Sequence, residues 1–303
     1  MGGLVSVTIP TKNAEKYIAL CLESIRNQTY PHIEVIVVDD NSKDRTADIA
    51  REFGAKIIRV RAGRSEARNI GAKNSRGEFI LSIDADMQLG FDAIEKCVSE
   101  ALRGAEAVII PEVADGQGFW AKCKCFERNL FIGEELVEVP RFFRRSVYWK
   151  LGGFDPMLEA GEDWDIAQRA REQGVTIKRV DSYLKHVEKN FNILRTIRRE
   201  YQYTRSFYHY VSKHPQLVRR QAMVYWKVLA QKRKELMRNL AYTLGLFTIK
   251  FFEAAAHIIG FLKGIILYKL QTPQTGSTPT ELLVEQTREP NTKLGLPRHE
   301  KFV

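Results

Sequence analysis

Short apolar runs alternate with helix-like stretches along the first half of the chain. The apolar runs are rich in Val and Ile and are bounded by polar residues or Gly, at 4–9, 33–38, 56–60, 79–83 and 107–110. Runs of this length and composition predict β-strands. The stretches with helical spacing lie between them, at 14–27, 44–53, 65–74 and 91–102. This alternation predicts an α/β fold with a mainly parallel sheet and helices on both faces.

The pattern changes after residue 190. Residues 191–270 hold a basic and aromatic stretch followed by a long apolar stretch, and both are suited to helices. Residues 271–303 are polar and hold four prolines, a composition typical of a flexible tail. The sequence therefore predicts an α/β domain over 1–190, a helical region over 191–270 and a tail over 271–303.

Positive charge is concentrated in the helical region. The chain of 303 residues has a formal net charge of +10, and residues 187–250 carry fourteen Lys or Arg against three acids. A localised basic surface is typical of proteins that bind phosphates, either of lipid headgroups or of nucleic acid.

The four cysteines indicate a reducing compartment. Cys21, Cys97, Cys123 and Cys125 lack the Cys-x-x-Cys spacing of zinc and redox sites, so we expect free thiols. A strand-like run follows the N-terminus directly, and we therefore expect no signal peptide and a cytoplasmic location.

A pair of carboxylates ends one of the predicted strands. Asp84 and Asp86 follow the apolar run 79–83 and are two residues apart, so an extended chain directs both to the same side. Two adjacent carboxylates suit a cation, and oxygen ligands favour Mg²⁺ or Mn²⁺. Gln88 can add a neutral oxygen, and His186, which follows a later extended segment, can complete the metal site. On its own the pair is more typical of a solvated turn after a strand.

Polar residues follow the other strands at the same edge of the sheet. The first strand leads into Pro10 and Asn13, the second into Asp39 and Asp40, and Arg68 lies in the helix before the carboxylate strand. Ligands bind beyond the carboxyl ends of such strands. The aspartates can accept hydrogen bonds from a base or ribose, and Arg68 can meet a diphosphate. No Gly-x-Gly-x-x-Gly or Gly-Lys-Ser/Thr loop is present, which argues against dinucleotide cofactors and P-loop NTPases.

A second acidic motif begins a predicted helix. Negative charge at Glu162 and Asp163 is favoured there by the helix dipole even without a function. The functional interpretation is a general base that takes the proton of an incoming hydroxyl. We expect Asp165 to lie on the outer face of this helix or to cap a turn.

Six motifs in this order resemble a family 2 glycosyltransferase of the GT-A fold, over about residues 4–190. They are Ile-Pro-Thr-Lys-Asn, Val-Val-Asp-Asp-Asn-Ser, Ala-Arg-Asn-Ile-Gly, Ile-Asp-Ala-Asp, Gly-Gly-Phe-Asp and Gly-Glu-Asp. The Asp-Ala-Asp-Met-Gln run is also similar to dolichyl-phosphate-mannose synthases, where the Gln position can join the metal site. Lys12 stands where many relatives carry Tyr.

The resemblance implies roles for individual residues. It places Pro10, Asp39 and Asp40 at the nucleoside, Arg68 near the diphosphate, and Asp84 at the ribose or the metal. Asp86 would bind the metal and Asp163 would be the catalytic base. Family members are inverting enzymes, so the implied reaction is one in-line displacement at the anomeric carbon of a nucleotide-diphosphate sugar, with Mg²⁺ or Mn²⁺ as cofactor.

The region after residue 190 suggests where the acceptor is presented. Arginines alternate with aromatic residues over 195–210, a pattern typical of nucleic-acid sites and of membrane interfaces alike. Residues 240–270 are long enough to span a bilayer but carry Lys250, Glu253 and His257 on one helical face. That favours interfacial helices over a spanning helix. A helical pair that closes over the α/β domain is the alternative.

The combined prediction is a glycosyltransferase attached peripherally to the cytoplasmic face of a membrane. Its acceptor would be a glycan or a polyprenyl-linked molecule, and nucleic acid is not expected as a partner. The alternatives are a nucleotidyltransferase, which would normally show a Gly-rich basic loop after the first strand, and a non-catalytic module that binds sugar nucleotides or nucleic acid. The presence of Asp84, Asp86, Glu162 and Asp163 together argues against a loss of catalysis.

Overall fold

A computed structural model describes residues 2–188 and 192–271 of the chain, so most of the predicted tail lies outside the described residues. The predicted alternation of strands and helices is confirmed. The strands that correspond to the five predicted runs are β1 (Val5–Thr11), β2 (Ile33–Asp39), β3 (Lys56–Arg59), β4 (Phe79–Ser82) and β6 (Ala107–Ile109). The helices between them are α1 (Ile18–Arg26), α2 (Thr46–Glu52), α3 (Arg64–Lys73) and α4 (Ala93–Leu102).

These strands belong to a seven-stranded sheet with the order β3-β2-β1-β4-β8-β6-β9. The sheet is completed by β8 (Phe142–Arg144) and β9 (Ile177–Arg179). All neighbours are parallel except β8, which runs antiparallel to β4 and β6. From β1 the chain first adds strands on one side of the sheet, β2 and β3, and then crosses to the other side with β4. Ligands bind at this switch point between β1 and β4 in such sheets.

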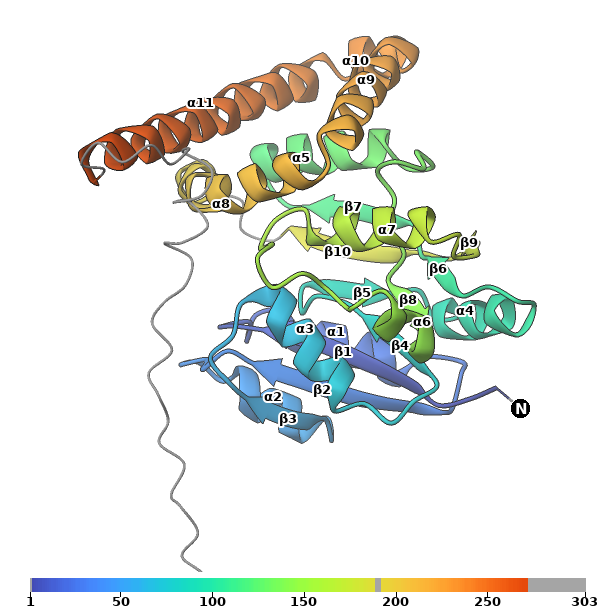
Figure 1. The fold of residues 1–303 in the computed structure, drawn as a ribbon. Coiled ribbons are helices and arrows are strands. Elements are labelled where there is room, and N and C mark those ends of the chain that lie inside the picture. The colour runs from blue at the N-terminus through green and yellow to red at the C-terminus, as the bar shows by residue number, and fades with distance from the viewer. Residues whose placement is uncertain (1, 189–191, 272–303) are drawn as a thin grey trace, which may run out of the picture.

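Both faces of the large sheet are covered, as the continuous apolar strands predicted. On one face, Val7, Leu81 and their neighbours form a core with α1 and α4. On the other face, Ile80 and Phe143 pack with residues of α6 (Arg145–Lys150) and α7 (Glu162–Glu172). The carboxyl ends of β1 and β4 are left as the open edge of this layered core (Figure 1).

A second, three-stranded sheet lies beyond that edge. It consists of β5 (Met87–Leu89), β10 (Leu184–Glu188) and β7 (Glu112–Gly116), with β10 in the middle. The antiparallel pairing of β10 with β5 sets His186 opposite Met87. This pairing brings His186 next to the Asp84–Asp86 segment, although nearly 100 residues of chain separate them.

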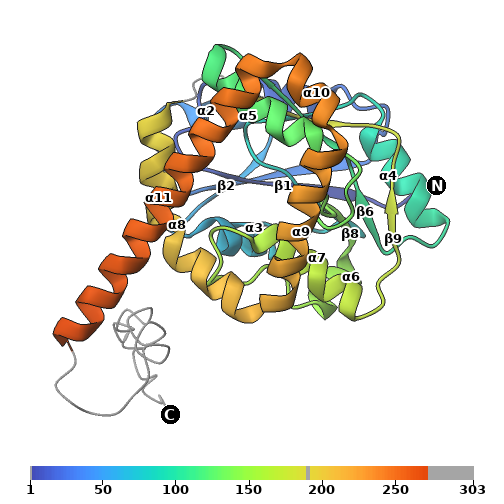
Figure 2. The same ribbon diagram turned by 90° about the horizontal axis from the view of Figure 1, so that it is seen from above.

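Helices lie across the second sheet and above the open edge (Figures 1 and 2). They are α5 (Phe119–Leu130), α8 (Ile193–Lys213), α9 (Pro215–Gln231), α10 (Arg233–Arg238) and α11 (Leu240–Gln271). The predicted C-terminal helical region is therefore confirmed. Apolar side chains of α5 and α9, including Leu130 and Val228, form a buried cluster of their own.

Four charged side chains join α11 to α5 in a closed ring. Lys250 contacts Glu127 at 2.6 Å and Glu253 at 2.9 Å, and Lys124 contacts Glu127 at 3.0 Å and Glu253 at 2.9 Å. The polar face predicted for 240–270 is thus directed inward onto α5. By length and composition alone, residues 240–260 could cross a membrane, and a third of that window is buried against the protein.

Candidate active site

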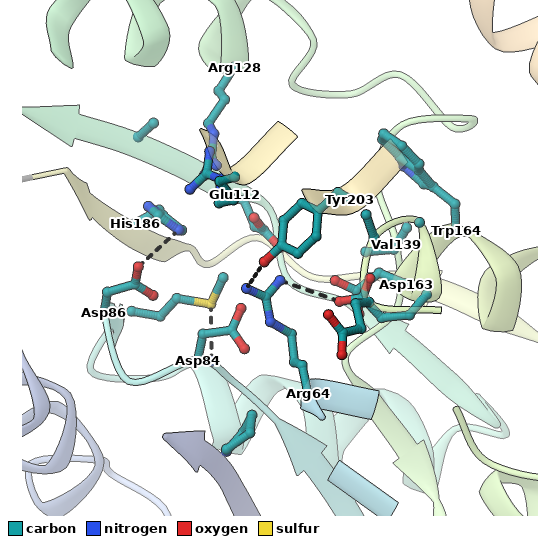
Figure 3. Close-up of a pocket in the computed structure, with 18 of the residues that line it drawn as sticks. Arg64, Asp84, Asp86, Glu112, Arg128, Val139, Asp163, Trp164, His186 and Tyr203 are labelled. Atoms are coloured by element: carbon teal, nitrogen blue, oxygen red, sulfur yellow. Dashed lines mark hydrogen bonds and ion pairs between the residues drawn. The ribbon is translucent and has the colours of Figure 1, made fainter. Parts of the chain in front are cut away.

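A cleft of about 1090 Å³ opens between the carboxyl ends of β1 and β4 and the helices above them (Figure 3). Its walls include the loops after β1 and β2, the start of α7, and residues of α5, α8 and α11. Most of the predicted site residues line it, namely Pro10, Asn13, Asp40, Asp84, Asp86, Glu162, Asp163 and His186. Asp39, Arg68 and Gln88 are not part of its lining.

Arg68 lies directly beneath the cleft floor with only 1% of its surface exposed. Its guanidinium donates to Asp84 at 2.8 Å, to Asp163 at 2.8 Å and to Glu162 at 3.0 Å. Burial opposes its charge, but the three carboxylates outweigh burial and hold the pKa of Arg68 well above its usual value. Arg68 therefore joins the two acidic motifs, and it is Arg64, one turn earlier on α3, that reaches the cleft itself.

The carboxylate pair is divided between two environments. Burial raises the pKa of Asp84, but the guanidinium groups of Arg68, Arg64 and Arg141 outweigh it and hold that pKa well below its usual range. The pKa of Asp86 is raised by burial; His186 opposes this rise and the charge of Asp84 adds to it. The Oδ2 atom of Asp86 lies 3.4 Å from Nε2 of His186.

This donor set fits a hard divalent cation. Two carboxylates and an imidazole are suitable ligands for Mg²⁺ or Mn²⁺, and a cation would relieve the repulsion that raises the pKa of Asp86. Within residues 2–188 and 192–271, no three acidic, His or Cys side chains are gathered as a ready-made metal site, and Asp84 accepts a hydrogen bond from Arg68. Such cations commonly complete their coordination with water and substrate phosphates.

Gln88 is absent from the lining of the cleft. In β5 successive side chains alternate between faces, so Met87 and Gln88 are directed oppositely. Met87 lines the cleft, and its sulfur accepts a 3.5 Å hydrogen bond from the amide of Asp84. Gln88 pairs in register with Lys185 and lies outside the cleft lining. Its role as a metal ligand stays a prediction.

Asp163 and Glu162 occupy the first turn of α7, directly after Gly161. Glu162 is almost fully buried, and burial together with the charge of Asp163 raises its pKa, against the opposing charges of Arg68 and Arg64. The side chain of Asp163 is 23% exposed and lines the cleft. Of the two predicted catalytic carboxylates, Asp163 is therefore the one that a substrate can reach.

Arg141 is a contact of Asp163 that the sequence analysis missed. Its Nη2 lies 3.3 Å from Asp163 and its Nε contacts Glu112 at 2.5 Å, while only 5% of the residue is exposed. Arg141 directly precedes the apolar pair Phe142 and Phe143, which indicates a buried position. A buried cation requires anionic partners, so this pattern could have predicted a contact with a carboxylate.

The loops after β1 and β2 are bound to each other. The amide of Asn13 donates to the hydroxyl of Ser42 at 2.8 Å, and the Asn13 side chain accepts from the amide of Lys43 at 2.9 Å. Lys12 pairs with Asp40 at 2.6 Å at the cleft wall. Asp39 lies behind this wall, fully buried, where it accepts from the Ser42 amide at 3.2 Å. The predicted nucleoside residues therefore form one wall, with Asp39 as its support.

The cleft also contains residues from the helices above, which no sequence motif indicated. Arg64 donates to the hydroxyl of Tyr203 on α8 at 3.4 Å and lies 3.6 Å from Glu162. Arg128 of α5 projects into the cleft near His186 and Glu112 (Figure 3). Among the described residues it has no salt-bridge partner within 4.0 Å, so its charge faces the cleft.

Asp165 does not lie on the outer face of α7. It is fully buried, with Arg169 at 2.6 Å, Lys213 at 2.8 Å and His214 at 2.7 Å. Lys213 and His214 come from the end of α8, nearly 50 residues away, and the local sequence around Asp165 contained no sign of them. His214 thus has a structural role.

Comparison with known proteins gives a consistent result. Residues 6–153 match the family model "Glycosyl transferase family 2". The putative glycosyltransferase EpsH of Bacillus subtilis (strain 168) is 38% identical over 117 residues, which cover 37% of this chain and 34% of that protein. The chondroitin synthase of Pasteurella multocida (strain Pm70) is 27% identical over 188 residues, or 56% of this chain and 19% of that protein. The chain thus spans about a third or less of these relatives.

Two solved structures resemble the fold. The mannosyltransferase PcManGT of Pyrobaculum calidifontis, in complex with GDP-Man and Mn²⁺, has a TM-score of 0.60 at 19% identity, with 86% of this chain and 88% of that chain covered. TarS 1–349 of S. aureus, in complex with UDP-GlcNAc, has a TM-score of 0.53 at 21% identity, with 67% of this chain and 64% of that chain covered. These similarities confirm the predicted fold class.

Proposed function

Residues 6–153 belong to glycosyl transferase family 2, and from this premise we propose that the chain transfers a sugar from a nucleotide-diphosphate sugar to an acceptor, with inversion at the anomeric carbon. The observation that carries the proposal is the position of Asp163. This reachable carboxylate lies in the same cleft as the Asp84–Asp86 pair, and Arg68 contacts both Asp84 and Asp163. The two ends of the Arg68 guanidinium would then hold the proposed base and one proposed metal ligand.

The donor would bind along the loops after β1 and β2. Pro10, Asn13 and Asp40 would face the nucleoside, and Asp39 would support them from behind. Arg64 and Arg128 are two of the cations that line the cleft, and they would meet the diphosphate oxygens. The nucleotide sugars in the PcManGT and TarS complexes support a donor of this class.

A divalent cation would be held by Asp84, Asp86 and His186. When bound, Mg²⁺ or Mn²⁺ neutralises charge on a leaving diphosphate. The Mn²⁺ in the PcManGT complex is consistent with this proposal.

Asp163 would accept the proton of an acceptor hydroxyl. The new bond forms between that hydroxyl oxygen and the anomeric carbon as the bond from the anomeric carbon to the diphosphate oxygen breaks, and the electron pair leaves with the diphosphate. Arg68 and Arg141 hold the two oxygens of Asp163, at 2.8 and 3.3 Å, and so fix the direction of the carboxylate. An acceptor phosphate that is already ionised would need no proton transfer.

The acceptor would enter beneath α8 and α11, where Tyr203, Phe207 and Tyr225 line the cleft. A glycan or a polyprenyl-linked acceptor suits this aromatic wall. On the opposite side of α11, Leu240, Leu244, Phe247, Phe251 and Ile258 form an exposed apolar stripe. The stripe and the basic residues of α9 and α10 support peripheral attachment to the cytoplasmic face of a membrane.

A panel of nucleotide sugars tests the proposed function. The thermal midpoint of the full chain would be measured with each nucleotide sugar, with and without Mn²⁺. We expect at least one of them to stabilise the protein, because a ligand that binds only the folded state raises its stability. If none does so under either metal condition, the proposed donor class is wrong.

A further inference from the structure

We propose that Ser206 of α8 is a positioning residue for the catalytic carboxylates Glu162 and Asp163. Ser206 lies more than 40 residues beyond them in the sequence and is not itself part of the cleft lining. The catalytic role of Glu162 and Asp163 rests on the proposed function, whereas the contacts of Ser206 do not depend on the reaction.

The hydroxyl of Ser206 holds the chain immediately before α7. It accepts hydrogen bonds from two consecutive amides, those of Glu159 at 2.8 Å and Ala160 at 2.9 Å. It also donates to the carbonyl of Ala160 at 3.2 Å. One donor and two acceptors are the full capacity of a hydroxyl. Only 8% of Ser206 is exposed, so water cannot readily replace these bonds.

The next turn of α8 closes on the residue that precedes Glu162. Gly161 has a φ of 81°, and a Cβ atom there would lie 3.0 Å from the ring of Tyr210. Tyr210 is 1% exposed and packs 6.0 Å from the ring of Trp164, measured between centroids. The backbone at the start of α7 therefore adopts a left-handed conformation that favours glycine, and α8 packs against it.

The end of α8 fixes both ends of the same segment. Lys213 contacts Asp155 at 2.7 Å and Asp165 at 2.8 Å, and His214 contacts Asp165 at 2.7 Å. Glu162 and Asp163 lie between these anchor points. On their other side they contact Arg68 of the α/β domain. The carboxylates thus receive their position from two sources, and on the α8 side Ser206 supplies the hydrogen bonds to the segment directly before Gly161.

A transferred proton demands close placement of its acceptor, and a displacement of about 1 Å can reduce a rate about 100-fold. Loss of the Ser206 hydroxyl leaves two amides and one carbonyl without this partner. We expect the segment to shift so that these groups can bond to water instead. We expect this movement to lower kcat and to leave donor binding unchanged, because the loops after β1 and β2 do not contact Ser206.

The experiment compares Ser206→Ala with Ser206→Thr, which keeps the hydroxyl, and with Ser212→Ala, an exposed serine on the same helix. Hydrogen–deuterium exchange of the peptide 156–166 would be measured in the full chain without substrate. We expect faster exchange in that peptide for Ser206→Ala alone, with peptides of β1 and β4 unchanged. Kinetic measurement should show a kcat at least tenfold lower and a donor KM within twofold of wild type.

Wild-type exchange and wild-type kcat in Ser206→Ala would overturn the proposal, and so would an equal defect in Ser206→Thr. If Ser206→Ala does not fold, Lys213→Met must show the same faster exchange, and its absence would equally overturn the proposal. The exchange measurement does not depend on any reaction. It therefore separates a failure of this inference from a failure of the donor panel.

Discussion

Arg68 and Asp163 are joined by a hydrogen bond of 2.8 Å that connects the core of the α/β domain to the start of α7. Since Arg68 also contacts Asp84, the acidic motif after β4 and the acidic motif at α7 share one buried cation. A change at any of these three residues is therefore expected to affect both motifs.

Replacement of Arg68 tests this shared cation. We expect Arg68→Met to lower the free energy of unfolding by about 3–5 kcal/mol, because it leaves three carboxylates without their buried partner. Urea denaturation followed by circular dichroism would measure the change. Arg76→Met is the matched control, since Arg76 pairs with Glu34 at the surface and should matter by less than about 1 kcal/mol. Equal losses in both variants would contradict the prediction.

Replacement of Asp163 tests the proposed base. Asp163→Asn keeps an oxygen for Arg68 but cannot accept a proton, so we expect kcat to fall by about 10²–10⁴-fold. Donor affinity, measured by calorimetry, should stay near the wild-type value. Asp48→Asn serves as control because Asp48 is an exposed residue of α2. Full activity of Asp163→Asn would remove this residue from the mechanism.

Removal of divalent cations tests the metal proposal. We expect a chelator to abolish transfer and added Mn²⁺ or Mg²⁺ to restore it. Asp86→Asn should raise the Mn²⁺ concentration for half-maximal activity by at least about tenfold, because one of the proposed ligands is lost. Asp92→Asn, a change at a surface salt bridge, should respond like wild type. Undiminished activity of the wild-type chain in chelator would refute metal dependence.

The apolar stripe of α11 tests membrane attachment. We expect the triple variant Leu244→Ser, Phe251→Ser and Ile258→Ser to reduce co-sedimentation with anionic vesicles at least tenfold, because it removes apolar area that would insert. The control is Phe91→Ser with Leu102→Ser, two exposed apolar residues around α4 on another side of the molecule. If the triple variant sediments like the control, the stripe does not mediate attachment.

Acidification tests the ring that joins α11 to α5. Burial alone would raise the pKa of Glu253, but Lys124 and Lys250 outweigh it and lower that pKa from 4.5 to about 2. A lowered folded-state pKa contributes stability that is present above pH 4.5 and is lost as the pH falls toward 2. In that window the unfolding free energy of wild type should fall more steeply than that of Glu253→Gln. Parallel curves from denaturant titrations would show that Glu253 is not coupled to folding.

The large sheet was predictable because its strands are buried on both faces. β2, for example, was predicted at 33–38 and is found at Ile33–Asp39. The second sheet was not predicted, because β5 has only three residues and β7 is mostly polar. Strands this short show no clear periodicity, and their partner β10 follows about 70 residues or more later.

The candidate site was predictable where a strand end or helix start shows polar residues locally. Asp84, Asp86 and Asp163 were predicted in this way, and they meet in one cleft together with His186. The environment of Asp165 was predicted wrongly because its partners Lys213 and His214 come from α8. Contacts of this kind depend on how distant helices pack, and no pattern near Asp165 encodes them.

The ring of Lys124, Glu127, Lys250 and Glu253 has a consequence for domain exchange between relatives. A chimera joined at residue 190 would keep α5 from one parent and take α11 from the other. The Lys and Glu of α5 would then face an α11 that did not evolve with them, and the Lys and Glu of α11 would face an α5 that did not evolve with them. A graft that aims to change acceptor choice should therefore carry α5 together with everything after residue 191. The interchangeable unit of this protein is discontinuous along the chain.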